Sequence, residues 1–149
     1  MKVHLRQIPA DGLHLEGEED CPIQDLKSED MECAGPLRYS LEVGISDGAV
    51  WASGTLAQPV QLRCVSCLET FVHTIEVPDF ALHMDGTGPE LVDFGPFVRE
   101  DILLNLPAYP RCDREGDRVC PAAKVIEERG SAEPETRKPD WSALDKLEL

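Results

Sequence analysis

Aromatic side chains and long apolar runs are scarce in this chain of 149 residues. Phe, Tyr and Trp make up 5% of the residues while 42% are hydrophobic, so the core must be built largely from Val, Leu and Ile. No run of about 18 apolar residues is present, so no typical membrane-spanning helix is expected. The N-terminal residues also lack the apolar stretch of a signal peptide, and we therefore expect a cytoplasmic protein.

Basic residues are also few. The chain has 29 acidic and 14 basic residues, which gives a formal net charge of −15. Phosphate backbones repel such a chain, so broad non-specific binding to nucleic acid is disfavoured. A basic protein partner is favoured because acidic surfaces attract cationic ones, although the acidity can also serve solubility alone.

Recognisable catalytic motifs are absent as well. There is no Gly-rich phosphate loop, nucleophile elbow or paired-carboxylate motif, so we expect no enzymatic activity and assign no catalytic residue. The histidines are scattered and none stands in a metal-binding motif: they are His4, His14, His73 and His83. Spacing alone leaves a Cys/His nucleophile pair open, since such partners are distant in sequence.

Alternating apolar residues indicate a series of short antiparallel strands. The expected strands cover residues 37–43, 50–56, 60–64, 71–77 and 80–84. Asp47-Gly48 between the first two is typical of a tight hairpin turn, because both positions of such a turn need positive φ angles. Pro96 precedes an apolar stretch that predicts one short helix over Phe97–Leu106. The sequence therefore predicts an α+β fold, mainly an antiparallel β meander or a partly open barrel.

The ends of the chain differ from this centre. We expect a single β-rich domain over residues 1–120, with an acidic arm at 16–35, and a flexible tail over 121–149 that is rich in Pro, Glu and Lys/Arg. Near the end of the tail, Trp141 begins an amphipathic turn that could fold back onto the sheet or bind a partner.

Two cysteine pairs form the most informative motif. Cys64 and Cys67 have the two-residue spacing with which a tight turn directs two thiolates at one tetrahedral ion. Cys112 and Cys120 have seven residues between them, more than the usual two to four. Together the pairs predict a structural zinc site with four cysteine ligands.

Other interpretations of the cysteines stay open. The four can be two buried and two loose residues, the first pair can be a redox motif, or Cys33 can replace Cys120 in a mixed site. Because no export signal is visible, thiols or metal ligands are favoured over three disulfides, and Cys21 and Cys33 are interpreted as free thiols.

Several segments together resemble a known family. They are Val60–Phe71 with the first cysteine pair, Glu100–Pro110, the two later cysteines, and Lys138–Trp141 before a Leu-containing terminal turn. Their order and spacing, from about Leu37 to the C-terminus, resemble those of the YceD family, the large ribosomal RNA subunit accumulation proteins.

The resemblance implies a bacterial or organellar protein, without catalytic activity, that is needed for normal accumulation of large-subunit ribosomal RNA. Cys64 and Cys67 match the family's paired cysteines, and Cys112 and Cys120 match its later cysteine region. The acidic helix and its Leu-x-Leu-Pro end are matched by Glu100, Leu104, Leu106 and Pro107.

These observations lead to one functional hypothesis and two alternatives. The main hypothesis is a ribosome-biogenesis accessory protein that binds ribosomal proteins or large-subunit assembly factors, with Glu100 and Trp141 as candidate partner-binding residues. The first alternative is direct binding of ribosomal RNA through Arg111, Arg114 and Arg118, and the second is a thiol redox protein. Neither a membrane nor a small-molecule substrate is expected.

Overall fold

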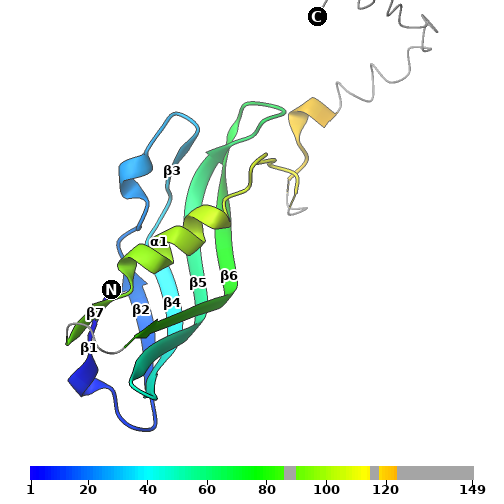
Figure 1. Cartoon of the computed structure of the whole chain (residues 1–149). Helices are drawn as coiled ribbons and strands as arrows, with labels where there is room; N and C mark the ends of the chain where they lie inside the picture. Colours follow the sequence, from blue (N-terminus) through cyan, green and yellow to red (C-terminus); the bar gives the residue numbers. More distant parts are fainter. Residues whose placement is uncertain (86–89, 115–117, 124–149) are drawn as a thin grey trace, which may run out of the picture.

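A computed structural model describes residues 1–85, 90–114 and 118–123 (Figure 1). The elements run in the order β1 (Lys2–His4), η1 (Leu5–Gln7), β2 (Leu13–Glu19), η2 (Gln24–Leu26), β3 (Met31–Cys33), β4 (Leu37–Ser46), β5 (Ala49–Arg63), β6 (Thr70–Asp85), β7 (Leu91–Asp93) and α1 (Gly95–Leu104). The predicted tail, apart from residues 121–123, and with it Trp141, lies outside the described residues.

An open antiparallel sheet forms the body. β2 pairs with β4, and β4 and β3 pair with successive parts of one edge of β5. β6 pairs with the other edge of β5 along its whole length, while β1 and β7 form a separate small ribbon. The prediction of a mainly antiparallel fold with one short helix is confirmed, and the sheets stay open instead of closing into a barrel. The predicted helix is also confirmed, although it begins and ends two residues earlier than expected.

The turn between β4 and β5 has the predicted form. Asp47 and Gly48 have φ angles of 52° and 77°, so the loop consists of two residues with left-handed backbone. Such a turn matches the twist of its flanking strands, and it sets the register in which Ser46 pairs with Ala49.

The prediction of separate short strands after this turn is wrong. β5 runs unbroken through Pro59 and β6 through Pro78, so two long strands replace the four short ones expected after the turn. The Pro59 carbonyl accepts from the N–H of Ala34, so the main chain of Pro59 faces the gap between β3 and β4, where its missing N–H interrupts no ladder. Pro78 stands in a β-bulge of β6, the place where strands tolerate proline.

The bulge changes the pairing of β5 and β6. The register passes from Leu56 opposite Val77 to Gly54 opposite Phe80, so two residues of β6 face Thr55 alone. Gly54 has a φ of 155°, and a Cβ atom there would lie 2.1 Å from the backbone oxygen of Ser40. The close approach of β4 to β5 at this point therefore requires glycine.

The core lies between the sheet and α1, which crosses one face of it (Figure 1). Val98 and Ile102 are the buried residues of the helix. They pack in one cluster with apolar side chains of the sheet that include Leu41, Val60 and Phe80. As the composition predicts, aliphatic side chains make up most of this core.

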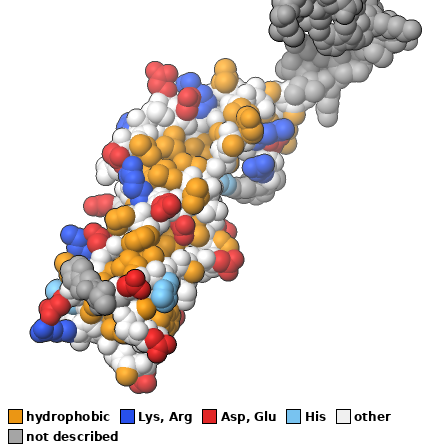
Figure 2. All heavy atoms as spheres, in the orientation of Figure 1, with side chains coloured by type: hydrophobic (Ala, Val, Ile, Leu, Met, Phe, Trp, Pro, Cys, Tyr) orange, Lys and Arg blue, Asp and Glu red, His pale blue; other side chains and the backbone are white. Residues whose placement is uncertain are grey.

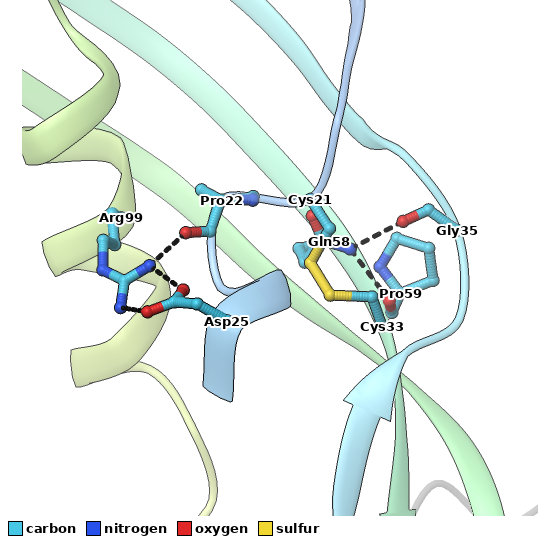
Figure 3. The surroundings of a disulfide bond; sticks show 8 residues. All are labelled: Cys21, Pro22, Asp25, Cys33, Gly35, Gln58, Pro59 and Arg99. Carbon is cyan, nitrogen blue, oxygen red and sulfur yellow. Dashed lines mark hydrogen bonds and ion pairs between the residues drawn. A yellow bond between two sulfur atoms is a disulfide. The ribbon is translucent and has the colours of Figure 1, made fainter. Parts of the chain in front are cut away.

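The acidic segment is folded more closely onto the body than a solvated arm would be. Its residues belong to β2, η2 and β3, and Ile23 is buried in the main core. Cys21 and Cys33 form a disulfide that closes this segment, so the prediction of two free thiols is wrong (Figure 3). The cause is tertiary: β3 pairs with β5, which places Cys33 beside the chain entering η2 with a Cα–Cα distance of 6.3 Å.

An ion pair fastens the same segment to the helix. Arg99 of α1 pairs with Asp25 through both terminal guanidinium nitrogens, Nη2 at 2.9 Å, and Nη1 also donates to the carbonyl of Pro22 (Figure 3). A hydrogen bond from the guanidinium of Arg99 lowers the pKa of the Asp25 carboxyl. The disulfide closes the segment on itself, the pairing of β3 holds it on β5, and this ion pair holds it on α1.

We predict that Gly54→Ala lowers the free energy of unfolding by about 2–4 kcal/mol, because the added Cβ would overlap the backbone of β4. Chemical denaturation followed by circular dichroism measures the change. Gly17→Ala is the matched control, since its Cβ would meet the outer end of the Tyr39 side chain, which can move, and no backbone atom. Equal stabilities of the two variants would contradict the prediction.

Candidate metal centre

The four predicted cysteines come together at one end of the β5–β6 hairpin. The Sγ atoms of Cys64, Cys67, Cys112 and Cys120 all lie within 4.8 Å of one another. The Cys64 and Cys120 sulfurs are 4.0 Å apart, and those of Cys67 and Cys112 are 3.7 Å apart. Four convergent sulfurs at this spacing can hold a metal ion.

The first pair is positioned by the turn that joins β5 to β6. The N–H of Cys64 donates to the carbonyl of Glu69 at 2.9 Å, and the N–H of Leu68 donates to the carbonyl of Cys64 at 2.9 Å. Leu68 has a φ of 62°, a left-handed conformation that is uncommon for a leucine. This reversal lets Cys64 and Cys67 direct their sulfurs to the same point.

The second pair is brought in by the chain that follows α1. The N–H of Val65 donates to the carbonyl of Pro110 at 2.9 Å, which places Cys112 against the turn. Arg118 forms an ion pair with Glu69 and brings Cys120 to the other side of the turn. Contacts with the hairpin therefore bring Cys112 and Cys120 together despite the seven residues between them. Residues 115–117 of the intervening loop lie outside the described residues.

The centre is shielded from water and separate from the main core. Cys64 and Cys120 are 0% and 1% exposed, Cys112 is 8% exposed, and Cys67 is half-buried. Phe71, Ala122 and Ala123 pack around the sulfurs. The prediction that all four cysteines share one place is confirmed, so the interpretation as two buried and two loose residues is wrong.

The thiols differ in how readily they lose a proton. Burial raises the pKa of Cys64, but the backbone N–H groups of Cys67, Cys112 and Ser66 favour its thiolate and lower the pKa to about 6. Burial, followed by the neighbouring sulfurs, raises the pKa of Cys112 to about 12. The pKa of Cys67 is also raised: the backbone N–H of Glu69 favours its thiolate, but burial and contacts with Cys64 and Cys120 outweigh that effect. One sulfur is thus ready to bind a cation, while further ionisation needs a cation to offset the crowded negative charge.

The geometry does not support the two other interpretations of the cysteines, a mixed site with Cys33 and a redox pair. Cys33 is bonded to Cys21, so it is not available to replace Cys120 in a mixed site. Cys64 and Cys67 lie in a turn between antiparallel strands, whereas a thioredoxin-like redox pair lies at a helix N-terminus in a βαβ unit.

The other candidate residues are distributed as follows. Glu100 is exposed on α1, Arg114 is exposed beside the centre, and Trp141 lies outside the described residues. Arg111 forms an ion pair with Asp113 at 2.9 Å, and Arg118 pairs with Glu69 as described above. Sequence reasoning gave no role to Glu69, although it lies in the Val60–Phe71 segment; it holds the turn through its carbonyl and Arg118 through its carboxylate.

Comparison of this chain with models of protein families, with curated proteins and with solved structures found no match. Among the described residues, no helix combines the length and the apolar character needed to cross a bilayer.

We predict that Cys64→Ser abolishes stoichiometric metal binding, because it removes the most buried sulfur and the one whose thiolate is stabilised by three N–H groups. Elemental analysis of the purified protein by mass spectrometry measures bound metal per chain. The double variant Cys21→Ser/Cys33→Ser is the control and should retain the metal, since the disulfide contributes none of the four sulfurs. Equal metal contents in the two variants would rule out this centre.

We also predict that the affinity for Zn²⁺ increases as the pH rises from 6 to 8. Metal must displace protons from Cys67 and Cys112, whose pKa values are raised, so a lower proton concentration favours binding. Below about pH 6 the Cys64 thiolate also becomes protonated, and affinity falls further. Competition with a chromophoric chelator, corrected for the chelator's own titration, tests this, and a pH-independent affinity would contradict it.

Proposed function

We propose that this protein is a non-catalytic accessory factor in biogenesis of the large ribosomal subunit, which binds a basic ribosomal protein or assembly factor and is braced by a structural zinc ion. One observation carries the proposal. The segments that resemble the YceD family, Val60–Phe71 and Glu100–Pro110, lead directly into the cysteine centre, and each is hydrogen-bonded to the other there through Val65 and Pro110. The family resemblance thus coincides with a single structural unit.

Zinc is the metal that suits this donor set. Four sulfur ligands in a closed, buried site are typical of structural zinc, whereas catalytic zinc keeps one position open for water or substrate. With Zn–S bonds of about 2.3 Å, a tetrahedral site has sulfur–sulfur separations of about 3.8 Å. The separations of 3.7 Å and 4.0 Å between the paired sulfurs are close to that value.

A zinc ion here would tie together two parts of the chain that the main core does not join. The turn between β5 and β6 carries one cysteine pair, and the chain beyond α1 carries the other. Among the described residues, a few partly buried side chains supply the apolar packing around the sulfurs. The proposed role of the metal is therefore to stabilise this end of the molecule, with no part in a reaction.

Charge supports a basic partner. Residues 1–110 contain 19 acidic and 6 basic residues, a net charge of 6 − 19 = −13, which leaves −2 for the rest of the chain. Acidic side chains are spread along the whole length of the body on the face drawn in Figure 2. A body of this charge attracts cationic proteins and accelerates their association at low ionic strength.

The geometry gives less support to direct binding of RNA. Of the three arginines proposed for it, Arg111 is paired with Asp113 and Arg118 with Glu69, so their charges are already partly neutralised. Phosphate contacts rely on cationic groups that displace counterions. Arg114 alone of the three has no acidic partner among the described residues.

We also propose a cytoplasmic location, because the zinc thiolates would be kept reduced there. The Cys21–Cys33 disulfide would be exposed to the same reducing glutathione pool. Arg99 and the pairing of β3 with β5 would then hold the segment without the covalent bond.

Affinity purification from native lysate tests the proposal. We expect the tagged full-length protein to recover large-subunit proteins, assembly factors or precursor particles, and we expect recovery to decrease in 0.5 M salt because the attraction is electrostatic. The Cys64→Ser variant should recover less, since the braced end of the molecule would be loosened. Recovery of none of these components by the wild-type protein would refute the proposed function.

A further inference from the structure

Strand β6 has an open outer edge. Within the described part of the chain it pairs with β5 alone, and no strand lies on its other side. Unpaired edges carry free main-chain donors and acceptors, which invite the addition of another strand.

The pairing with β5 shows which groups point outward. Thr74 lies opposite Pro59, which has no N–H and whose carbonyl faces Ala34 on the far side of β5. In an antiparallel pair the two opposite residues either exchange both hydrogen bonds or none, so the N–H and C=O of Thr74 point to the outer edge. By alternation, the main-chain groups of Val72 and Glu76 point there too.

An independent contact agrees with this assignment. Arg118 donates to the carbonyl of Thr70 at 3.5 Å, and Thr70 belongs to the same alternating set. A guanidinium of this chain thus already approaches the upper end of the edge, close to the cysteine centre.

The edge is accompanied by a hollow. A cavity of about 570 Å³ is lined by His73, Thr74, Ile75 and Glu76 of β6 and by Asn105 at the end of α1. Both N–H groups of Asn105, main-chain and side-chain, point toward the carbonyl of Asp101, so its side chain is held at the rim. There is therefore room beside the strand for another segment.

The composition of the edge also sets it apart. Residues 70–77 read Thr-Phe-Val-His-Thr-Ile-Glu-Val, with Glu76 as their one formal charge, although 29% of the whole chain is charged. Val72 is 59% exposed on this stretch. Proteins usually protect such edges with charges, proline or bulges, and here Pro78 and its bulge protect only the part beyond residue 77.

We propose that the outer edge of β6 from Thr70 to Glu76 binds an extended segment of a basic protein, which adds to the sheet as a further strand. Main-chain hydrogen bonds to Val72, Thr74 and Glu76 supply the affinity, and Glu76 together with the net negative charge of the chain selects cationic side chains. The inference rests on the proposed function in one respect, that the partner is basic.

Charge decides between the possible occupants. A second copy of this chain also carries a net charge of −15, so pairing edge to edge would bring two strongly acidic bodies together. A lysine-rich segment instead places opposite charge beside Glu76, which lines the hollow. The structure therefore favours a cationic strand over self-association.

Amide hydrogen exchange of the full-length protein tests the proposal directly. The probe is a synthetic ten-residue peptide that alternates lysine with valine and threonine, and the control peptide has glutamate in place of lysine. We expect the amides of Val72, Thr74 and Glu76 to exchange rapidly in the free protein and at least about tenfold more slowly with the lysine peptide. The inward amides of His73 and Ile75 should be slow in both states and serve as an internal control.

Two matched variants locate the binding on the edge. Thr74→Pro removes an outward N–H that the β5–β6 ladder does not use, so the fold should persist while peptide affinity falls about tenfold or more. Thr74→Val retains the N–H and should bind like the wild type. Glu76→Lys should weaken binding of the lysine peptide and improve binding of the glutamate peptide.

The proposal would be overturned if the lysine peptide did not bind, or if Thr74→Pro bound it with unchanged affinity. It would also be overturned if the outward amides were already protected from exchange in the free protein, because the chain would then cover its own edge. Thermal unfolding of each variant confirms that it is folded. If Thr74→Pro still recovers large-subunit components from lysate, the proposed function stands and the edge is not its site. If the wild-type protein recovers no large-subunit components but binds the lysine peptide, the proposed function fails and the edge remains a binding site.

Discussion

The antiparallel pairing of β5 with β6 is the interaction on which the rest of this structure depends. It runs from Ala49 opposite Asp85 to Arg63 opposite Thr70, longer than any other pairing in the described chain. One part of this hairpin supports α1 and the core, and its far end presents the first two cysteines. Because one element carries both, the position of the cysteine centre relative to the core is set by strand length and twist.

Two prolines show how such a long hairpin is possible. Pro59 uses the gap between two neighbouring strands, and Pro78 uses a bulge, so neither removes a hydrogen bond from the β5–β6 ladder. Their effects on the surface differ, however. The bulge at Pro78 disturbs the outer edge of β6 beyond residue 77, whereas the unbroken stretch before it leaves a regular edge beside the cysteine centre.

Local patterns predicted the local features well. Alternation of apolar residues located the strands, Asp47-Gly48 located the hairpin turn, and the spacing of Cys64 and Cys67 indicated a shared ligand site. The errors came from tertiary context. Proline ends a strand only where its missing N–H is needed, and whether it is needed depends on neighbours far away in sequence. The Cys21–Cys33 bond likewise depends on the pairing of β3 with β5, and no pattern within the acidic segment predicts that pairing.

The six cysteines place opposite chemical demands on their surroundings. Cys21 and Cys33 are joined by oxidation, whereas the other four are useful as ligands only while reduced. Sulfurs 3.7 Å and 4.0 Å apart are also close enough that, without a metal, an oxidant could convert them into two adventitious disulfides after small movements. A bound ion would therefore act as a protecting group during synthesis and folding. The order of metal loading and oxidation would then determine which covalent form of the protein accumulates.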